Sequence, residues 1–176
     1  MSTEYGKRIT GALNAVAQLH SDTSKLLVDF DSRMLRSGWT SVFDNFATRD
    51  LTYHVKADYW MAEGVYRYYF HEAFPKSIRA LTVCFLARQI EEPVLLTAKV
   101  NYRMESGAQI KLVCKGWDVW QIYFDWMKEA ELERVMECGA LDNGRIESAA
   151  VLAVPLYSIN KIEDVDAKML QVMKAS

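Results

Sequence analysis

The chain has 176 residues, of which 51% are hydrophobic and 25% are charged, and its formal net charge is −2. This composition excludes a disordered chain, and the length suits one domain that needs neither a disulfide nor a metal to fold. The charge is 0 over residues 1–60, +2 over 61–120 and −4 over 121–176, so no third carries the basic field that sequence-independent DNA binding requires.

The three cysteines, Cys84, Cys114 and Cys138, predict free thiols in a reducing compartment. Their odd number and long spacings give neither a disulfide framework nor a CxxC pair. The first residues lack the apolar core of a signal peptide, and no apolar run approaches the roughly 18–20 residues that cross a bilayer. We therefore expect a cytoplasmic protein that is not embedded in a membrane.

Residues 7–36 carry the pattern of one long helix, or of two nearly collinear ones, that ends near Gly38. Apolar positions follow each other at alternating spacings of four and three, which is a heptad seam. The seam consists of Ile9, Leu13, Val16, His20, Thr23, Leu27, Phe30 and Met34. Two interpretations stay open, because such a seam either packs on its own sheet or pairs with a second copy of the chain.

A period of two begins at residue 51 and predicts a strand over 51–59. The segment "GVYRYYFHEAF" predicts another strand after a turn at "MAEG", although a helix over 61–73 also fits. Within 77–90 the chain is apolar on both faces between Ala80 and Ala87, as in a central strand, and 94–104 alternate as in a strand with one wet face. With a further strand over 109–115, these segments predict an antiparallel meander.

The segment "WDVWQIYFDWM" (117–127) fits either a strand or a helix, and we favour a strand to about Phe124 followed by a helix near 125–138. Residues 146–159 predict a strand whose Pro155 indicates an edge or a bulge. Asn160 and Glu163 resemble a capping box that begins a last helix over 161–174.

Together these segments predict one α+β domain over residues 1–176. It has a mainly antiparallel sheet of about five to six strands, with a long N-terminal helix and a C-terminal helix packed on one face. Residues 1–46 are the N-terminal helical segment, 47–159 the sheet with its inserted helix, and 160–176 the C-terminal helix. The layout is similar to small sensor domains of the GAF or PAS kind, a likeness of fold that implies little about function.

The catalytic motifs that we tested fail. "HEAFP" begins like the zinc-binding HExxH motif, but Pro75 stands where the second histidine belongs. "SINK" matches the SxxK of Ser/Lys acylating enzymes without the companion elements of that family. We therefore predict no catalytic and no metal-binding residue, lean against an enzyme and leave the cofactor open.

Residues 53–79 interleave aromatic with basic side chains. Packing in the core is the leading explanation, and a small-molecule pocket is the alternative because tyrosine offers an apolar body and a hydroxyl. The candidate ligand-binding residues are Tyr53, Tyr59, Trp60, Tyr66, Tyr68 and Phe70. The candidate self-association residues are Ile9, Leu13, Val16, Leu27, Phe30 and Met34.

We therefore expect a non-enzymatic intracellular regulatory or small-ligand-binding module that forms a homo-oligomer through its N-terminal helix. One alternative is a hydrolase-like enzyme whose site assembles only in the fold, from Asp58, Glu63, His54 or His71. Another is a nucleic-acid-binding accessory protein that uses 53–79 and 99–115, but acidic residues within the first of these stretches nearly cancel its charge.

Overall fold

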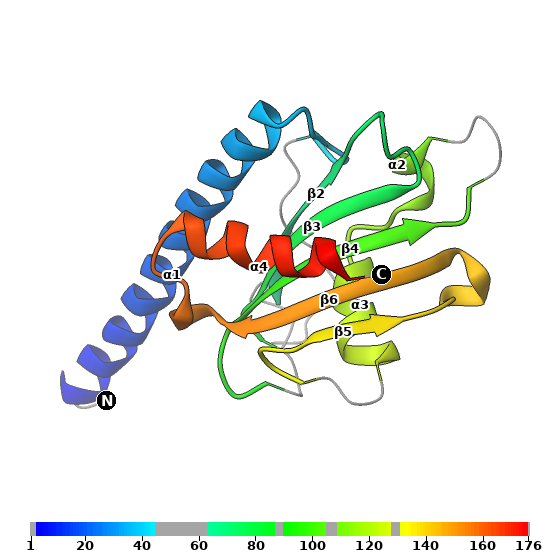
Figure 1. The fold of residues 1–176 in the computed structure, drawn as a ribbon. Helices are drawn as coiled ribbons and strands as arrows, with labels where there is room; N and C mark the ends of the chain where they lie inside the picture. Colours follow the sequence, from blue (N-terminus) through cyan, green and yellow to red (C-terminus); the bar gives the residue numbers. More distant parts are fainter. Residues whose placement is uncertain (1–2, 45–62, 87–89, 105–108, 128–130, 176) are drawn as a thin grey trace.

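The computed structural model describes residues 3–44, 63–86, 90–104, 109–127 and 131–175 (Figure 1). They form an α+β domain around one six-stranded sheet with the order β1-β2-β3-β4-β6-β5, in which all neighbouring strands are antiparallel. The predicted fold class, with a long N-terminal helix and a C-terminal helix, is confirmed. The strand predicted over 51–59 lies outside the described residues.

The strands are β1 (Thr40–Ser41), β2 (Gly64–Phe70), β3 (Ser77–Cys84), β4 (Val94–Tyr102), β5 (Val135–Cys138) and β6 (Ile146–Pro155). The strands predicted after "MAEG", in 77–90, in 94–104 and in 146–159 therefore exist, each within narrower limits. Pro155 is the last residue of β6 and pairs with Val94, beyond the stretch that β6 shares with β5. A residue without an N–H is tolerated at such a strand end.

The helices lie on both faces of the sheet (Figure 1). Helices α1 (Thr3–Arg36) and α4 (Ile162–Lys174) cover one face. Helices α2 (Ile110–Val113) and α3 (Asp118–Gln121), followed by the π-helical turn η2 (Ile122–Trp126), cover the other. Short 3₁₀ turns, η3 (Asp142–Gly144) and η4 (Leu156–Ser158), flank β6. The helical layer on the second face was not predicted, since the segments that form it, within 109–127, were assigned mainly to strands.

Three element assignments from the sequence are wrong. Residues 109–115 were predicted as a strand, but α2 occupies the middle of this segment. Residues 117–124 were also predicted as a strand, but they form α3 and most of η2. The helix near 125–138 is replaced at its end by strand β5, which pairs with β6 at the edge of the sheet. Val119 and Ile122 are fully buried against the sheet at helical spacing, so tertiary packing overrides the β-rich composition.

Alternation along the central strand β4 divides the core into two clusters. Leu96, Ala98 and Val100 point towards α2 and α3, whereas Leu95 points towards α1 and α4. On the α4 side, the Lys99 Nζ atom donates a hydrogen bond to the backbone oxygen of Ala175 at 3.3 Å.

The end of α1 is built as the sequence predicts. Gly38 has a φ of +79°, and its N–H donates to the Leu35 oxygen at 3.0 Å. The N–H of Trp39 donates to the Met34 oxygen at 3.0 Å, so the two bonds form a Schellman motif. Trp39 and Met34 are both buried in the same cluster, which turns the chain into β1.

The start of α4 differs in detail from the prediction. The Asp164 carboxylate, not that of Glu163, accepts the N–H groups of Asn160 and Lys161 at 3.0 and 3.1 Å. The helix begins one residue later than a cap at Asn160 implies, so the acceptor also moves by one position along the chain.

We expect Phe30→Ala to lower the free energy of unfolding by about 3–5 kcal/mol, because it empties a fully enclosed site between α1 and the sheet. Leu35→Ala is the matched control on the same helix, since Leu35 is 61% exposed and its truncation changes stability by about 0.5 kcal/mol or less. Urea unfolding followed by circular dichroism measures both variants. Equal losses would contradict the assigned face of α1.

Candidate functional site

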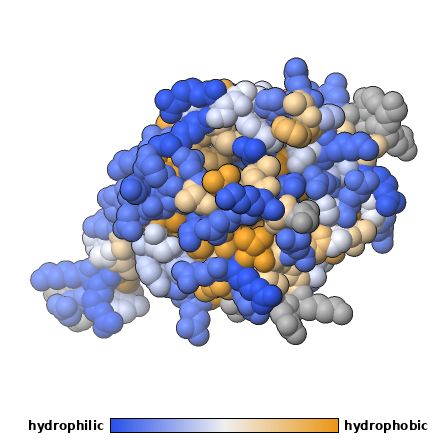
Figure 2. Space-filling model, in the orientation of Figure 1, coloured by the Kyte–Doolittle hydropathy of each residue, from blue (hydrophilic) through white to orange (hydrophobic). Residues whose placement is uncertain are grey.

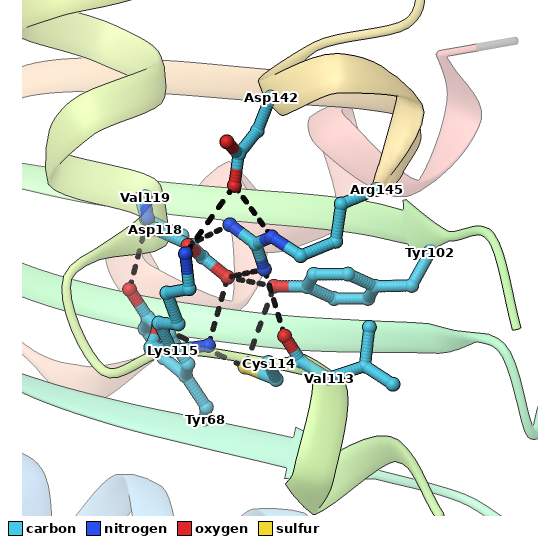
Figure 3. A network of polar contacts seen from close by, with 9 residues as sticks. All are labelled: Tyr68, Tyr102, Val113, Cys114, Lys115, Asp118, Val119, Asp142 and Arg145. Atoms are coloured by element: carbon cyan, nitrogen blue, oxygen red, sulfur yellow. Dashed lines mark hydrogen bonds and ion pairs between the residues drawn. The ribbon is translucent and has the colours of Figure 1, made fainter. Parts of the chain in front are cut away.

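A fully buried carboxylate lies between the sheet and the α2–α3 layer (Figure 3). The Asp118 oxygens accept two hydrogen bonds from the Arg145 guanidinium, at 2.6 and 2.8 Å. They also accept the Tyr102 hydroxyl at 2.8 Å and the N–H of Lys115 at 2.9 Å. Four donors around one carboxylate offset the cost of burying its charge.

The same arginine connects three segments of the chain. Arg145 Nη1 also donates to the Val113 oxygen at 2.8 Å, and its Nε donates to Asp142 Oδ2 at 2.6 Å. Next to it, the Tyr68 hydroxyl accepts the N–H of Val119 at 2.9 Å (Figure 3). The polar groups of this cluster are directed at one another, so the cluster fastens the α2–α3 layer to β2, β4 and β6.

The thiol at the edge of this cluster is not an activated nucleophile. Cys114 is 5% exposed, and burial raises the pKa of its thiol to about 12. The thiol therefore stays protonated at neutral pH, whereas nucleophilic cysteines need an accessible thiolate. Burial likewise raises the pKa values of Tyr68 and Tyr102, which keeps both hydroxyls protonated.

A second polar cluster fixes the C-terminal half of α1 on the opposite face of the sheet. Arg67 of β2 donates from Nε and Nη2 to the two Asp31 oxygens, at 2.9 and 2.6 Å. The Tyr69 hydroxyl donates to the same carboxylate, and burial raises its pKa. Arg33, two residues after Asp31 on α1, pairs with Glu163 and Asp166 of α4.

The N-terminal half of α1 is more exposed than the half that carries Asp31 and Arg33. Its residues 4–15 are all exposed, including Ile9 at 42% and Leu13 at 65%. Figure 1 shows this end of the helix extending beyond the strands. We call residues 4–18 the α1 overhang. Its apolar side chains continue the seam that, from Thr23 onward, is buried on the sheet.

A groove of about 510 Å³ begins where the overhang ends, between α1, the turn before β4 and the connection from β6 to α4. We call it the α1–α4 groove. Its apolar lining comprises Leu19, Leu26, Pro93, Leu156, Tyr157, Ile159 and Ile162. Its polar lining comprises Asp22, Thr23, Asp29, Glu92, Asn160 and Lys161. The buried Thr23 hydroxyl has no hydrogen-bond partner among the described residues, and such a group is rare in a finished core.

Figure 2 shows the face of the domain that carries α1 and α4. Apolar surface, in orange, lies in the middle of this face among hydrophilic side chains, in blue. On the other side of the molecule, a second groove of about 500 Å³ lies between β1, the end of β2 and α2, and it includes Phe70, Gln109 and Lys111.

Three of the six predicted ligand-binding residues lie within the described part of the chain. Tyr53, Tyr59 and Trp60 lie outside the described residues. Tyr66, Tyr68 and Phe70 project from one face of β2 into the cluster under α2 and α3. The ring centroids of Tyr66 and Tyr68 are 5.3 Å apart, and Tyr68 is 1% exposed. Phe70 alone of these three lines one of the two grooves.

The predicted self-association residues divide into two groups. Leu27, Phe30 and Met34 are buried against the chain's own sheet, whereas Ile9 and Leu13 are exposed and Val16 is half-buried. The C-terminal half of the heptad seam therefore packs on the chain's own sheet, and Ile9 and Leu13 are not covered by it.

The residues proposed for a hydrolase-like site do not converge among the described residues. His54 and Asp58 lie outside them. Glu63 and His71 stand at opposite ends of β2, whose seven residues span about 24 Å. His71 Nδ1 accepts the N–H of Ala73 at 3.0 Å, and its ring centroid lies 5.4 Å from that of Trp39.

Sequence reasoning missed both polar clusters and the α1–α4 groove. Asp118 and Arg145 are 27 residues apart and match no motif. The groove joins residues 19–29 with 92–93 and 156–162, which only the fold brings together. In the described part of the chain, no three His, Cys, Asp or Glu residues gather as a metal site needs. Its helices contain no segment with the length and hydropathy needed to cross a membrane.

Comparisons with protein-family models, with curated proteins and with solved structures found no match.

We expect Asp118→Ala to destabilise the fold by about 3–5 kcal/mol, because Arg145 then keeps a partly buried charge without its anion. Tyr102→Phe removes one donor to the same carboxylate and costs about 1 kcal/mol. Chemical unfolding of both variants measures the difference. A loss of less than about 1 kcal/mol for Asp118→Ala would contradict the structural role of the cluster.

We expect iodoacetamide at pH 8 to leave Cys84 and Cys114 unlabelled in the folded protein, because burial raises both thiol pKa values. Unfolding in guanidinium exposes both thiols to the reagent, and peptide mass spectrometry locates the label. Rapid labelling of Cys114 in the folded protein would show an accessible thiolate and reopen a catalytic role for it.

Proposed function

We propose that this protein is a non-enzymatic, cytoplasmic regulatory module that self-associates through the α1 overhang. The observation that carries the proposal is the heptad seam, which is buried on the sheet at Leu27, Phe30 and Met34 but exposed at Ile9 and Leu13. Apolar positions at alternating spacings of four and three on a free helix are what paired helices use.

Burial of the exposed apolar side chains of the seam is the driving force for the proposed association. Each apolar side chain such as Ile9 or Leu13 gains about 1.5–3 kcal/mol when it moves from water into an apolar contact. In a symmetric pair, both chains contribute the same side chains, so every contact is counted twice.

The arrangement of the ionisable groups supports a binding role over a catalytic one. Asp118, Arg145 and Tyr102 are directed at one another, and so are Asp31, Arg67 and Tyr69 on the opposite face. A catalytic pair must instead point at a substrate in a cleft. The α1–α4 groove is lined by apolar side chains from three segments and by acidic side chains of α1, which suits recognition of another molecule.

We expect the double variant Ile9→Asp/Leu13→Asp to be monomeric, because it places two charges on each side of the proposed contact. Size-exclusion chromatography with light scattering at about 20 μM compares it with the unaltered chain, which we expect to be a dimer. Leu35→Asp is the matched control, since Leu35 is about as exposed as Leu13 but lies near the C-terminal end of α1, outside the overhang.

The control variant should remain dimeric. A monomeric unaltered chain, or a double variant that still dimerises, would contradict self-association through the overhang. Circular dichroism of each variant confirms that the fold is retained.

A further inference from the structure

We infer that the α1–α4 groove is the receptor for the overhang of a second copy, so that two chains exchange overhangs along antiparallel α1 helices. This inference rests on the proposed self-association and adds the place where each overhang binds. In this dimer, the exposed seam of each overhang binds in the groove of the other chain.

The direction of the seam makes this exchange possible. Ile9 and Leu13 lie on the same stripe of α1 as Phe30 and Met34, which face the chain's own sheet. When the two-fold axis is perpendicular to the plane that contains two antiparallel helices, both sheets lie on the same side of the helix pair, and the inferred dimer has this arrangement. The exposed stripe of each overhang therefore faces the body of the partner chain, at the position of the partner's groove.

The apolar chemistry of the two surfaces matches. The groove offers Leu19 and Leu26 on α1 and Leu156, Ile159 and Ile162 on the connection to α4. An amphipathic helix that lies in such a groove contacts both walls through side chains at spacings of three and four. Ile9, Leu13 and Val16 of the overhang have that spacing.

The charges are complementary as well. The groove lining carries Asp22, Asp29 and Glu92 against Lys161, a net charge of −2. The overhang carries Lys7 and Arg8 against Glu4, a net charge of +1. In an antiparallel pair centred between Gln18 and Leu19, Arg8 of one helix lies opposite Asp29 of the other, because both are equally far from the centre.

Contact between the two overhangs alone would bury less apolar surface than exchange of the overhangs into the grooves. It would leave both acidic grooves open to water and would bury only the first part of each seam. Exchange covers the overhang and the groove in one symmetric interface, in which every contact occurs twice.

A charge-reversal experiment tests this assignment. We expect Arg8→Glu and Asp29→Arg each to raise the dissociation constant of the dimer about tenfold or more, because a repulsive pair then occurs twice in the interface. The double variant Arg8→Glu/Asp29→Arg restores the opposite charges, and we expect its dissociation constant to return to within about threefold of the original. Sedimentation equilibrium at low salt measures all four proteins. Glu147→Lys, an exposed charge reversal on β6, is the control.

A charge placed on the wall of the groove between β6 and α4 provides a second test. Tyr157 is 74% exposed and lines the groove, whereas Leu170 is 56% exposed on α4 and does not. We expect Tyr157→Glu to weaken the dimer and Leu170→Glu to leave it unchanged. Neither residue is buried, so the fold survives both substitutions.

The outcomes separate the two proposals. If Ile9→Asp/Leu13→Asp dissociates the dimer while the reversals at Arg8 and Asp29 and Tyr157→Glu leave it intact, the groove assignment is overturned and self-association stands. Singles that weaken the dimer without rescue by the double variant would overturn the antiparallel pairing. A monomeric unaltered chain would remove both proposals. A small molecule retained in a dimer that is insensitive to the groove variants would give the groove to that molecule.

Discussion

The length of α1 relative to the sheet governs this structure. A helix of 34 residues is about 51 Å long, whereas the central strands of seven to ten residues span about 24–34 Å. One sheet can therefore bury only part of the helix. Phe30, Arg67 and Arg33 select the C-terminal half for burial, and the remaining turns carry their apolar stripe into water.

The two polar clusters explain why the helical layers are held against the sheet, whereas the overhang is exposed. Asp118 with Arg145 fastens the short helices to one face of the sheet, and Asp31 with Arg67 fastens α1 to the other. In each cluster the carboxylate accepts hydrogen bonds from an arginine and a tyrosine of the same chain, which stabilises the layers. Among the described residues, the surfaces open to another molecule include the α1–α4 groove, the groove beside β1 and the overhang.

Hydrophobic periodicity predicted the long helices and the strands whose apolar residues recur at a regular spacing. The long helix, its end at Gly38, the strands at 77–84 and 94–102 and the last helix all follow from spacing and from caps. Residues 109–127 were assigned wrongly, because Val119 and Ile122 become helical through packing on the sheet, which local β propensity does not register. The groove was not predictable, since its walls come from three distant segments. The seam was visible in the sequence, but which half is buried depends on where the sheet ends.

Self-association through the overhang is the central claim, and the mass of the unaltered chain under native conditions tests it most directly. The chain has a mass of 20.2 kDa, so a dimer has twice this mass, 40.4 kDa. Native mass spectrometry at about 10 μM, compared with the denatured mass, is predicted to show the 40.4 kDa species, since interfaces of paired helices persist at this concentration. A single species at 20.2 kDa would contradict the account and would leave the exposed half of the seam without a function.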